Sequence, residues 1–102
     1  MNKFNVELSD DAQTDFFEYI NHIIEVYKEP ITAAKHYSAF IKELMKLEYT
    51  ADIYQIQNRD DFHNFGTNVR RVNFKKMAII YTIHGDMVLI RHIVAASTIT
   101  GI

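Results

Sequence analysis

The side chains best suited to holding an anion are basic residues concentrated after position 64. They are Arg70, Arg71, Lys75, Lys76 and Arg91. Residues 65–102 contain one acidic side chain and have a formal charge of +4, whereas residues 1–64, with six basic and twelve acidic side chains, have a charge of −6. This asymmetry favours an anionic partner for the C-terminal part, because guanidinium and ammonium groups pair with carboxylates or phosphates. The alternative is that both sets of charges serve only to keep two layers of the protein soluble.

The chain lacks the residues or the residue spacing that nucleophilic catalysis, disulfide formation and metal binding need. The chain has no cysteine, which excludes a thiolate nucleophile, a disulfide and a cysteine-based zinc site. Its five histidines show no paired spacing of the kind that metal ligands have. Asp60 and Asp61 fit a solvated turn, and neither Ser9 nor Ser97 stands in the strand–turn–helix setting of a nucleophilic serine. We therefore predict no catalytic residue, no bound metal and no cofactor.

Length and composition predict one small domain that spans residues 1–102. The chain is 48% hydrophobic and 24% charged, with three glycines and one proline. This composition supports one modest core and excludes intrinsic disorder. No apolar run approaches the roughly 18 residues of a membrane span, and the N-terminus lacks the apolar region of a secretion signal. Together with the absence of cysteine, these features predict a soluble cytoplasmic protein that does not associate with membranes.

The first half of the chain has the pattern of a strand followed by two helices. Apolar and polar residues alternate over 3–8, which predicts a short half-buried strand. Ser9, followed by two aspartates, supplies an N-cap for one helix, and Pro30 suits the first turn of another. The apolar residues expected to form buried helical stripes are Ala12, Phe16, Tyr19, Ile20, Ile23 and Tyr27 in the first helix and Ala34, Tyr37, Ile41, Leu44 and Leu47, widened by Ala33 and Phe40, in the second.

The second half changes from helical to strand periodicity. Residues 49–66 show no clear period, and we expect a long connection there with a short strand at Ile53–Ile56. Beyond it, a period of two predicts strands at 69–74, 77–83 and 87–94, joined by turns at Lys75-Lys76 and Gly85-Asp86. The second of these strands is almost continuously apolar, which is typical of a central strand covered by helices.

The predicted fold class is α+β: an N-terminal strand, an α-helical hairpin and then an antiparallel three-strand meander, with the helices packed on one face of a twisted sheet. We expect the other face to be exposed and to carry the function. Adjacent residues of a strand point to opposite faces, so Arg70 and Arg71 should diverge, as should Arg91 and His92. One of the first two arginines would then join an anion-binding surface, and the other would pair with a helix carboxylate.

The order and spacing of these features resemble the RelE/ParE family of toxins from type II toxin–antitoxin and plasmid-stabilisation systems. The resemblance spans nearly the whole chain and rests on Leu8-Ser9 followed by Ala12, the Pro30 break, Gly66, Arg70-Arg71-Val72, Ile79-Ile80-Tyr81, Gly85-Asp86 and Val88-x-Ile90-Arg91. It implies a compact toxin fold, action in the cytoplasm and a cognate antitoxin in a tight complex, with a homodimer or a heterotetramer as the assembly. The implied target is DNA gyrase in the ParE branch or ribosome-bound message in the RelE branch.

Toxins of the RelE branch cut RNA with a set of basic side chains and a tyrosine that follows the last strand. Arg70 and Arg71 match the basic positions on the second strand of that branch. Ala78 stands where the arginine of the third strand falls, Thr98 lies near the position of the later arginine, and no tyrosine follows Tyr81. Most of the set that would hold a phosphate and move protons is therefore missing.

We therefore predict a ParE-like toxin that acts by protein–protein binding, in which the five basic residues bind the partner or target. The acidic helices are the alternative docking surface for the antitoxin. Ala95–Thr98 replaces the basic ending of the ParE branch, so two other interpretations stay open. These are a RelE-like messenger endonuclease and a non-toxic family member that only binds an antitoxin.

Overall fold

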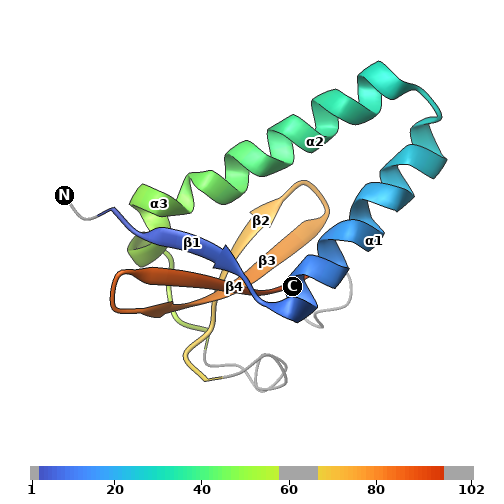
Figure 1. Cartoon of the computed structure of the whole chain (residues 1–102). Coiled ribbons are helices and arrows are strands. Elements are labelled where there is room, and N and C mark those ends of the chain that lie inside the picture. Colours follow the sequence, from blue (N-terminus) through green and yellow to red (C-terminus); the bar gives the residue numbers. More distant parts are fainter. Residues whose placement is uncertain (1–2, 58–66, 96–102) are drawn as a thin grey trace.

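The computed structural model describes residues 3–57 and 67–95, which form four strands, three α-helices and one turn of 3-10 helix (Figure 1). Their bounds are β1 Asn5–Leu8, α1 Asp10–Tyr27, α2 Pro30–Met45, α3 Leu47–Thr50, η1 Ala51–Ile53, β2 Arg70–Phe74, β3 Met77–His84 and β4 Met87–Ala95. No described helix is long and apolar enough to cross a membrane.

The four strands form one sheet in the order β1-β4-β3-β2. Strands β2, β3 and β4 pair antiparallel, which confirms the predicted meander. Strand β1 pairs with β4 in parallel, from Asn5 beside Met87 to Leu8 beside Ile90. The first strand of the chain therefore lies against the last, an arrangement that the local sequence pattern does not specify.

The helices cover one face of the sheet, which confirms the predicted layering (Figure 1). The core between the layers consists of Phe4, which precedes β1, of buried residues from the helical segments, Ala12, Phe40, Leu44, Leu47 and Ala51, and of buried residues from the strands, Val72, Ile79, Tyr81, Val88, Ile90 and Ile93. Phe40 of α2 joins the two layers. Its ring lies 4.8 Å from that of Tyr19 on α1 and 5.2 Å from that of Phe74 on β2. Such tilted and edge-on aromatic pairs add to the stabilisation that comes from burial.

The opposite face of the sheet differs from the prediction. Val69, Ala78 and Ile80 form a second buried cluster there, together with the partly buried Val94. Thr82 of β3 is buried as well. The expectation that this face is left exposed is therefore wrong along β3.

The connection after α2 also differs from the prediction, because helical structure continues to Ile53 as α3 and η1. Leu47 and Ala51, one helical turn apart, are both buried, and this burial favours continued helix over a strand. The short strand expected at Ile53–Ile56 is therefore wrong. What exists there is one isolated bridge between Ile56 and Arg70, followed by a 2.8 Å hydrogen bond that the Gln57 amide donates to the Val69 carbonyl.

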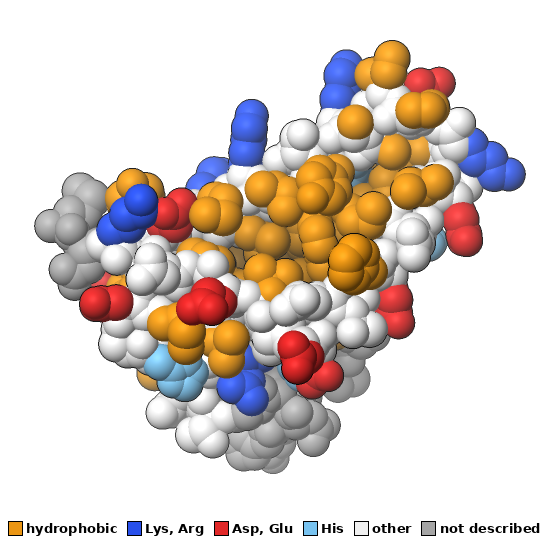
Figure 2. All heavy atoms as spheres, in the orientation of Figure 1, with side chains coloured by type: hydrophobic (Ala, Val, Ile, Leu, Met, Phe, Trp, Pro, Cys, Tyr) orange, Lys and Arg blue, Asp and Glu red, His pale blue; other side chains and the backbone are white. Residues whose placement is uncertain are grey.

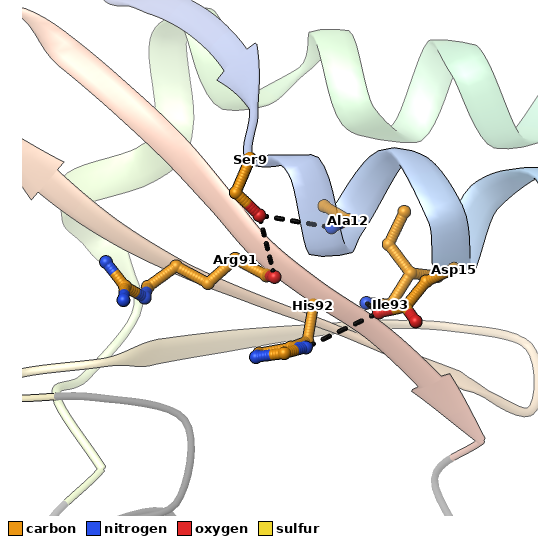
Figure 3. Close-up of polar contacts among 6 residues, drawn as sticks. All are labelled: Ser9, Ala12, Asp15, Arg91, His92 and Ile93. Atoms are coloured by element: carbon orange, nitrogen blue, oxygen red, sulfur yellow. Dashed lines mark hydrogen bonds and ion pairs between the residues drawn. The ribbon is translucent and has the colours of Figure 1, made fainter.

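The junction between β1 and α1 fixes the first helix to the sheet (Figure 3). Ser9 is the N-cap of α1: its Oγ accepts from the Ala12 amide at 3.1 Å and donates to the Arg91 carbonyl of β4 at 2.9 Å. Further along, Oδ2 of Asp15 accepts a 3.0 Å hydrogen bond from the Ile93 amide. The pairing of β1 with β4 ends at Leu8. Beyond it, the side chains of the N-cap Ser9 and of Asp15 on α1 supply hydrogen-bond partners for the backbone of β4.

We expect Asp15→Ala to lower the free energy of unfolding by about 1–3 kcal/mol, because the Ile93 amide loses its acceptor. Asp11→Ala is the matched control, since this exposed aspartate in the first turn of the same helix interacts mainly with the helix dipole. It should cost only about 0.3–1 kcal/mol. Urea unfolding of the three proteins measures both values, and equal losses would contradict the assigned role of Asp15.

Candidate binding surfaces

Arg70 lies on the helix-covered side of the sheet and binds backbone. Its Nη1 donates to the carbonyls of Asp52 at 3.2 Å and Tyr54 at 2.5 Å. Its partner across the sheet, Tyr81, is fully buried and donates from its hydroxyl to the Ala51 carbonyl at 2.6 Å. Burial raises the pKa of Tyr81, so its hydroxyl remains a donor. Arg70 and Tyr81 thus attach the segment 51–54, which follows α3, to strands β2 and β3. Arg70 therefore has a structural role.

Arg71 lies on the other face, as the alternation of a strand requires. It stands opposite Ile80, and its Nε donates to Oδ1 of Asn73 at 2.7 Å. The two lysines expected in the turn between β2 and β3 are indeed there and are exposed. Lys75 has a positive φ of 54°, and its Nζ lies over the Phe74 ring, 5.5 Å from the centroid.

Arg91 and His92 share one side of β4, contrary to the expectation that they face opposite ways. The pairing register shifts between Ile80 and Tyr81, so that Arg91 is an extra residue in β4. Ile90 and Ile93 both belong to the core under the helices, which leaves the two residues between them on the opposite side. A β-bulge has this effect because it interrupts the alternation of the strand.

His92 also contacts α1. Its Nδ1 lies 3.5 Å from Oδ2 of Asp15, a contact that becomes an ion pair when the imidazole is protonated (Figure 3). The sheet register places Arg71, Ile80 and His92 in one row across three strands. The structure thus brings Arg71, Arg91 and His92 to one face and separates Arg70 from them. Among the described residues, no group of three histidine, aspartate or glutamate side chains could hold a metal ion.

A surface that the sequence reasoning missed lies between α1 and α2. We call it the helix trough: it is lined by Ile20, Ile24, Pro30, Ala33, Ala34 and Tyr37, with Lys28 and Glu29 at the end where the helices meet. Its volume is about 670 Å³. Figure 2 shows hydrophobic side chains gathered along this hollow.

The apolar stripes of both helices are wider than the core can cover. Phe17 is 67% exposed and Ile24 is 54% exposed. Tyr27, Ala34 and Tyr37, which were expected to be buried, are exposed as well. The signal in the sequence was the width of each stripe, because Phe17, Ile20 and Ile24 recur at helical spacing beside the residues that face the sheet. Exposed apolar faces of this kind are typical of surfaces that bind another molecule.

Between the helices and the β2–β3 turn, His36 lies in an aromatic cluster. Its Nε2 is 2.5 Å from the Tyr19 hydroxyl, and its ring packs against Tyr27 and edge-on against Phe74. Burial, and then the positive charge of Lys75, lower the pKa of His36. Burial also raises the pKa of Tyr19. Neutral His36 therefore stabilises the contact between α1, α2 and the turn.

Comparison with known proteins identifies the fold. No protein-family model and no curated protein matches the sequence. The structure does match a chain in the solved structure of the chromosomal ParDE TA system from P. aeruginosa, with a TM-score of 0.72 and 15% sequence identity. The match covers 91% of this chain and 96% of that one. The protein has the fold of that chain. This agrees with the fold that the resemblance to RelE/ParE toxins implied.

We expect Arg70→Ala to destabilise the fold by about 1–3 kcal/mol, because the Asp52 and Tyr54 carbonyls lose a charged donor. Lys76→Ala, which also removes one positive charge but from an exposed turn, should change stability by less than about 0.5 kcal/mol. Thermal and urea unfolding compare the two variants with the wild-type protein. If Arg70→Ala is as mild as Lys76→Ala, Arg70 is available for a partner after all.

Stability should fall as the pH drops through the ordinary pKa of histidine, about 6.5. The pKa of His36 is lower in the folded than in the unfolded chain, so the unfolded chain binds more protons in that interval and acid favours unfolding. His36→Gln, which keeps a hydrogen-bonding group beside Tyr19, should flatten this slope. His22→Gln, on the exposed surface of α1, controls for the substitution itself. Unfolding free energies from about pH 7.5 to 5 test this, and an unchanged slope in His36→Gln would refute it.

Proposed function

We propose that this protein is the toxin of a type II toxin–antitoxin system, ParE-like, and that a cognate antitoxin neutralises it. The observation that carries the proposal is the match of nearly the whole fold to a chain of a ParDE system. The resemblance of the sequence to RelE/ParE toxins supports it independently of the fold. A partner protein also accounts for the exposed apolar faces of α1 and α2.

The antitoxin is proposed to lay an amphipathic helix in the helix trough. Apolar side chains at a spacing of three and four residues on such a helix would contact Ile20, Ile24 and Tyr37, and this is the usual way in which a helix binds a groove. Acidic residues elsewhere in the antitoxin would pair with Arg71, Lys75, Lys76 and Arg91. Because these cations are partly exposed or exposed, they would affect mainly the rate of association. Arg70 leaves the proposed set, since its guanidinium binds backbone carbonyls.

The proposed target is a protein, of the gyrase type, rather than RNA. The position at which the RelE branch has an arginine is occupied by Ala78, which is fully buried. This position therefore offers no basic group that could hold RNA. One observation favours a ribosome-dependent endonuclease as the second candidate. His92, held by Asp15, shares a face with Arg71 and Arg91, so a proton-transferring group lies on the same side as two groups suited to a phosphate. The third candidate is a non-toxic protein that binds only an antitoxin.

Expression of the chain alone in a bacterium separates these candidates. We expect growth arrest and loss of gyrase supercoiling activity, while messages on purified ribosomes stay intact. His92→Gln should remain toxic, because a protein-binding toxin does not need a proton-transferring group. Message cleavage that His92→Gln abolishes would establish the endonuclease instead. Normal growth and normal supercoiling, with the folded protein present, would leave the non-toxic binder.

A further inference from the structure

The two walls of the helix trough carry opposite charges. Helix α1 contains five acidic residues and no lysine or arginine. On its exposed surface, Glu18 and Glu25 are seven residues apart, which places both on one side of the helix. On α2, Lys35 and Lys42 have the same spacing and are also exposed. Each helix therefore presents a charged stripe of one sign.

Both stripes border the trough. Lys35 and Lys42 line a shallow hollow on α2 that also includes Ala34, and Ala34 is one of the residues that line the trough. On α1, each glutamate directly follows an exposed apolar residue, Phe17 or Ile24. Figure 2 shows mostly lysine and arginine side chains along the upper margin of the hydrophobic hollow and mostly acidic side chains along its lower margin.

We propose that, in the absence of an antitoxin, the trough is covered by the trough of a second copy of this chain. Two copies can face each other about a two-fold axis that runs along the trough. This rotation places α1 of one copy against α2 of the other, so that each acidic stripe meets a basic one. A two-fold axis across the trough would instead set like charges against each other, and like-charge contacts disfavour a complex.

The positions along the helices fit this arrangement. Glu18 lies ten residues before Lys28, the C-cap of α1, and Lys42 lies twelve residues after Pro30, where α2 begins. They are therefore at a similar distance from the tip of the hairpin. A two-fold axis along the trough preserves that distance, so it brings Glu18 opposite Lys42 of the second copy and Glu25 opposite Lys35. The exposed apolar residues between the stripes become the core of the interface.

This inference concerns the chain alone and does not depend on the proposed toxin function. If both are right, a second copy and an antitoxin helix compete for the same trough. Self-association would then oppose formation of the antitoxin complex at high concentrations of the free chain.

Sedimentation equilibrium or light scattering of the purified protein tests the dimer. The wild-type chain should dimerise, and Phe17→Ser should be monomeric although it folds, because Phe17 is exposed in the monomer. Lys42→Glu and Glu18→Lys should each raise the dimer dissociation constant at least about tenfold, because each sets like charges against each other twice in a symmetric dimer. High salt should relieve part of that loss.

The decisive sample is an equimolar mixture of Lys42→Glu and Glu18→Lys, in which every facing pair is again of opposite charge. The mixture should dimerise about as well as the wild-type chain. Lys76→Glu and Asp86→Lys, the same charge changes in exposed turns of the sheet, should leave the dimer unchanged. A wild-type chain that stays monomeric at every concentration, or a mixture that behaves as two monomers, would overturn the proposal.

Discussion

The backbone of β4 sets the constraint on which the rest of the structure depends. This strand lies inside the sheet, so its amides and carbonyls need partners on both edges. Strand β3 supplies them on one edge, but β1 on the other edge is shorter and ends at Leu8. The N-cap Ser9 and Asp15 of α1 then bind the Arg91 carbonyl and the Ile93 amide. These two hydrogen bonds fix the start of α1 beside β4. The direction of the helical hairpin and the position of the helix trough follow from the position of that helix.

The local pattern of apolar and polar residues was enough to predict the helices and strands. It failed where contacts between residues far apart in the sequence determine the structure. The period of two and the periods of three and four predicted the strands and helices because they report which sides of each element are apolar. They contain no information on the parallel pairing of β1 with β4, or on the bulge that places Arg91 and His92 on one side. The strand expected at Ile53–Ile56 failed for the same reason, because buried contacts of Leu47 and Ala51 favour helix there.

The distribution of charge along the sequence does not predict where the charged side chains lie on the folded protein. The sum over residues 1–64 is negative, and this sum conceals that α1 and α2 present stripes of opposite sign. Within the basic segment, Arg70 and Arg71 are neighbours of the same type, yet one binds backbone at the end of the sheet and the other lies on the far face. The width of an apolar stripe was visible in the sequence, but only the packing shows which part of it the sheet covers.

The pairing of β1 with β4 also determines the order in which parts of the chain can fold during synthesis. Ser9 and Arg91 are 82 positions apart, so the ribosome must add all the residues between them before the first strand and the first helix can meet β4. The helical hairpin, which depends on short-range contacts, forms early, whereas closure of the sheet waits for the last strand and for a costly long-range loop. Until then the hairpin exposes its core side as well as its trough. A nascent chain of this protein therefore presents the core side of its hairpin in addition to the trough, whereas in the folded chain the sheet covers the core side.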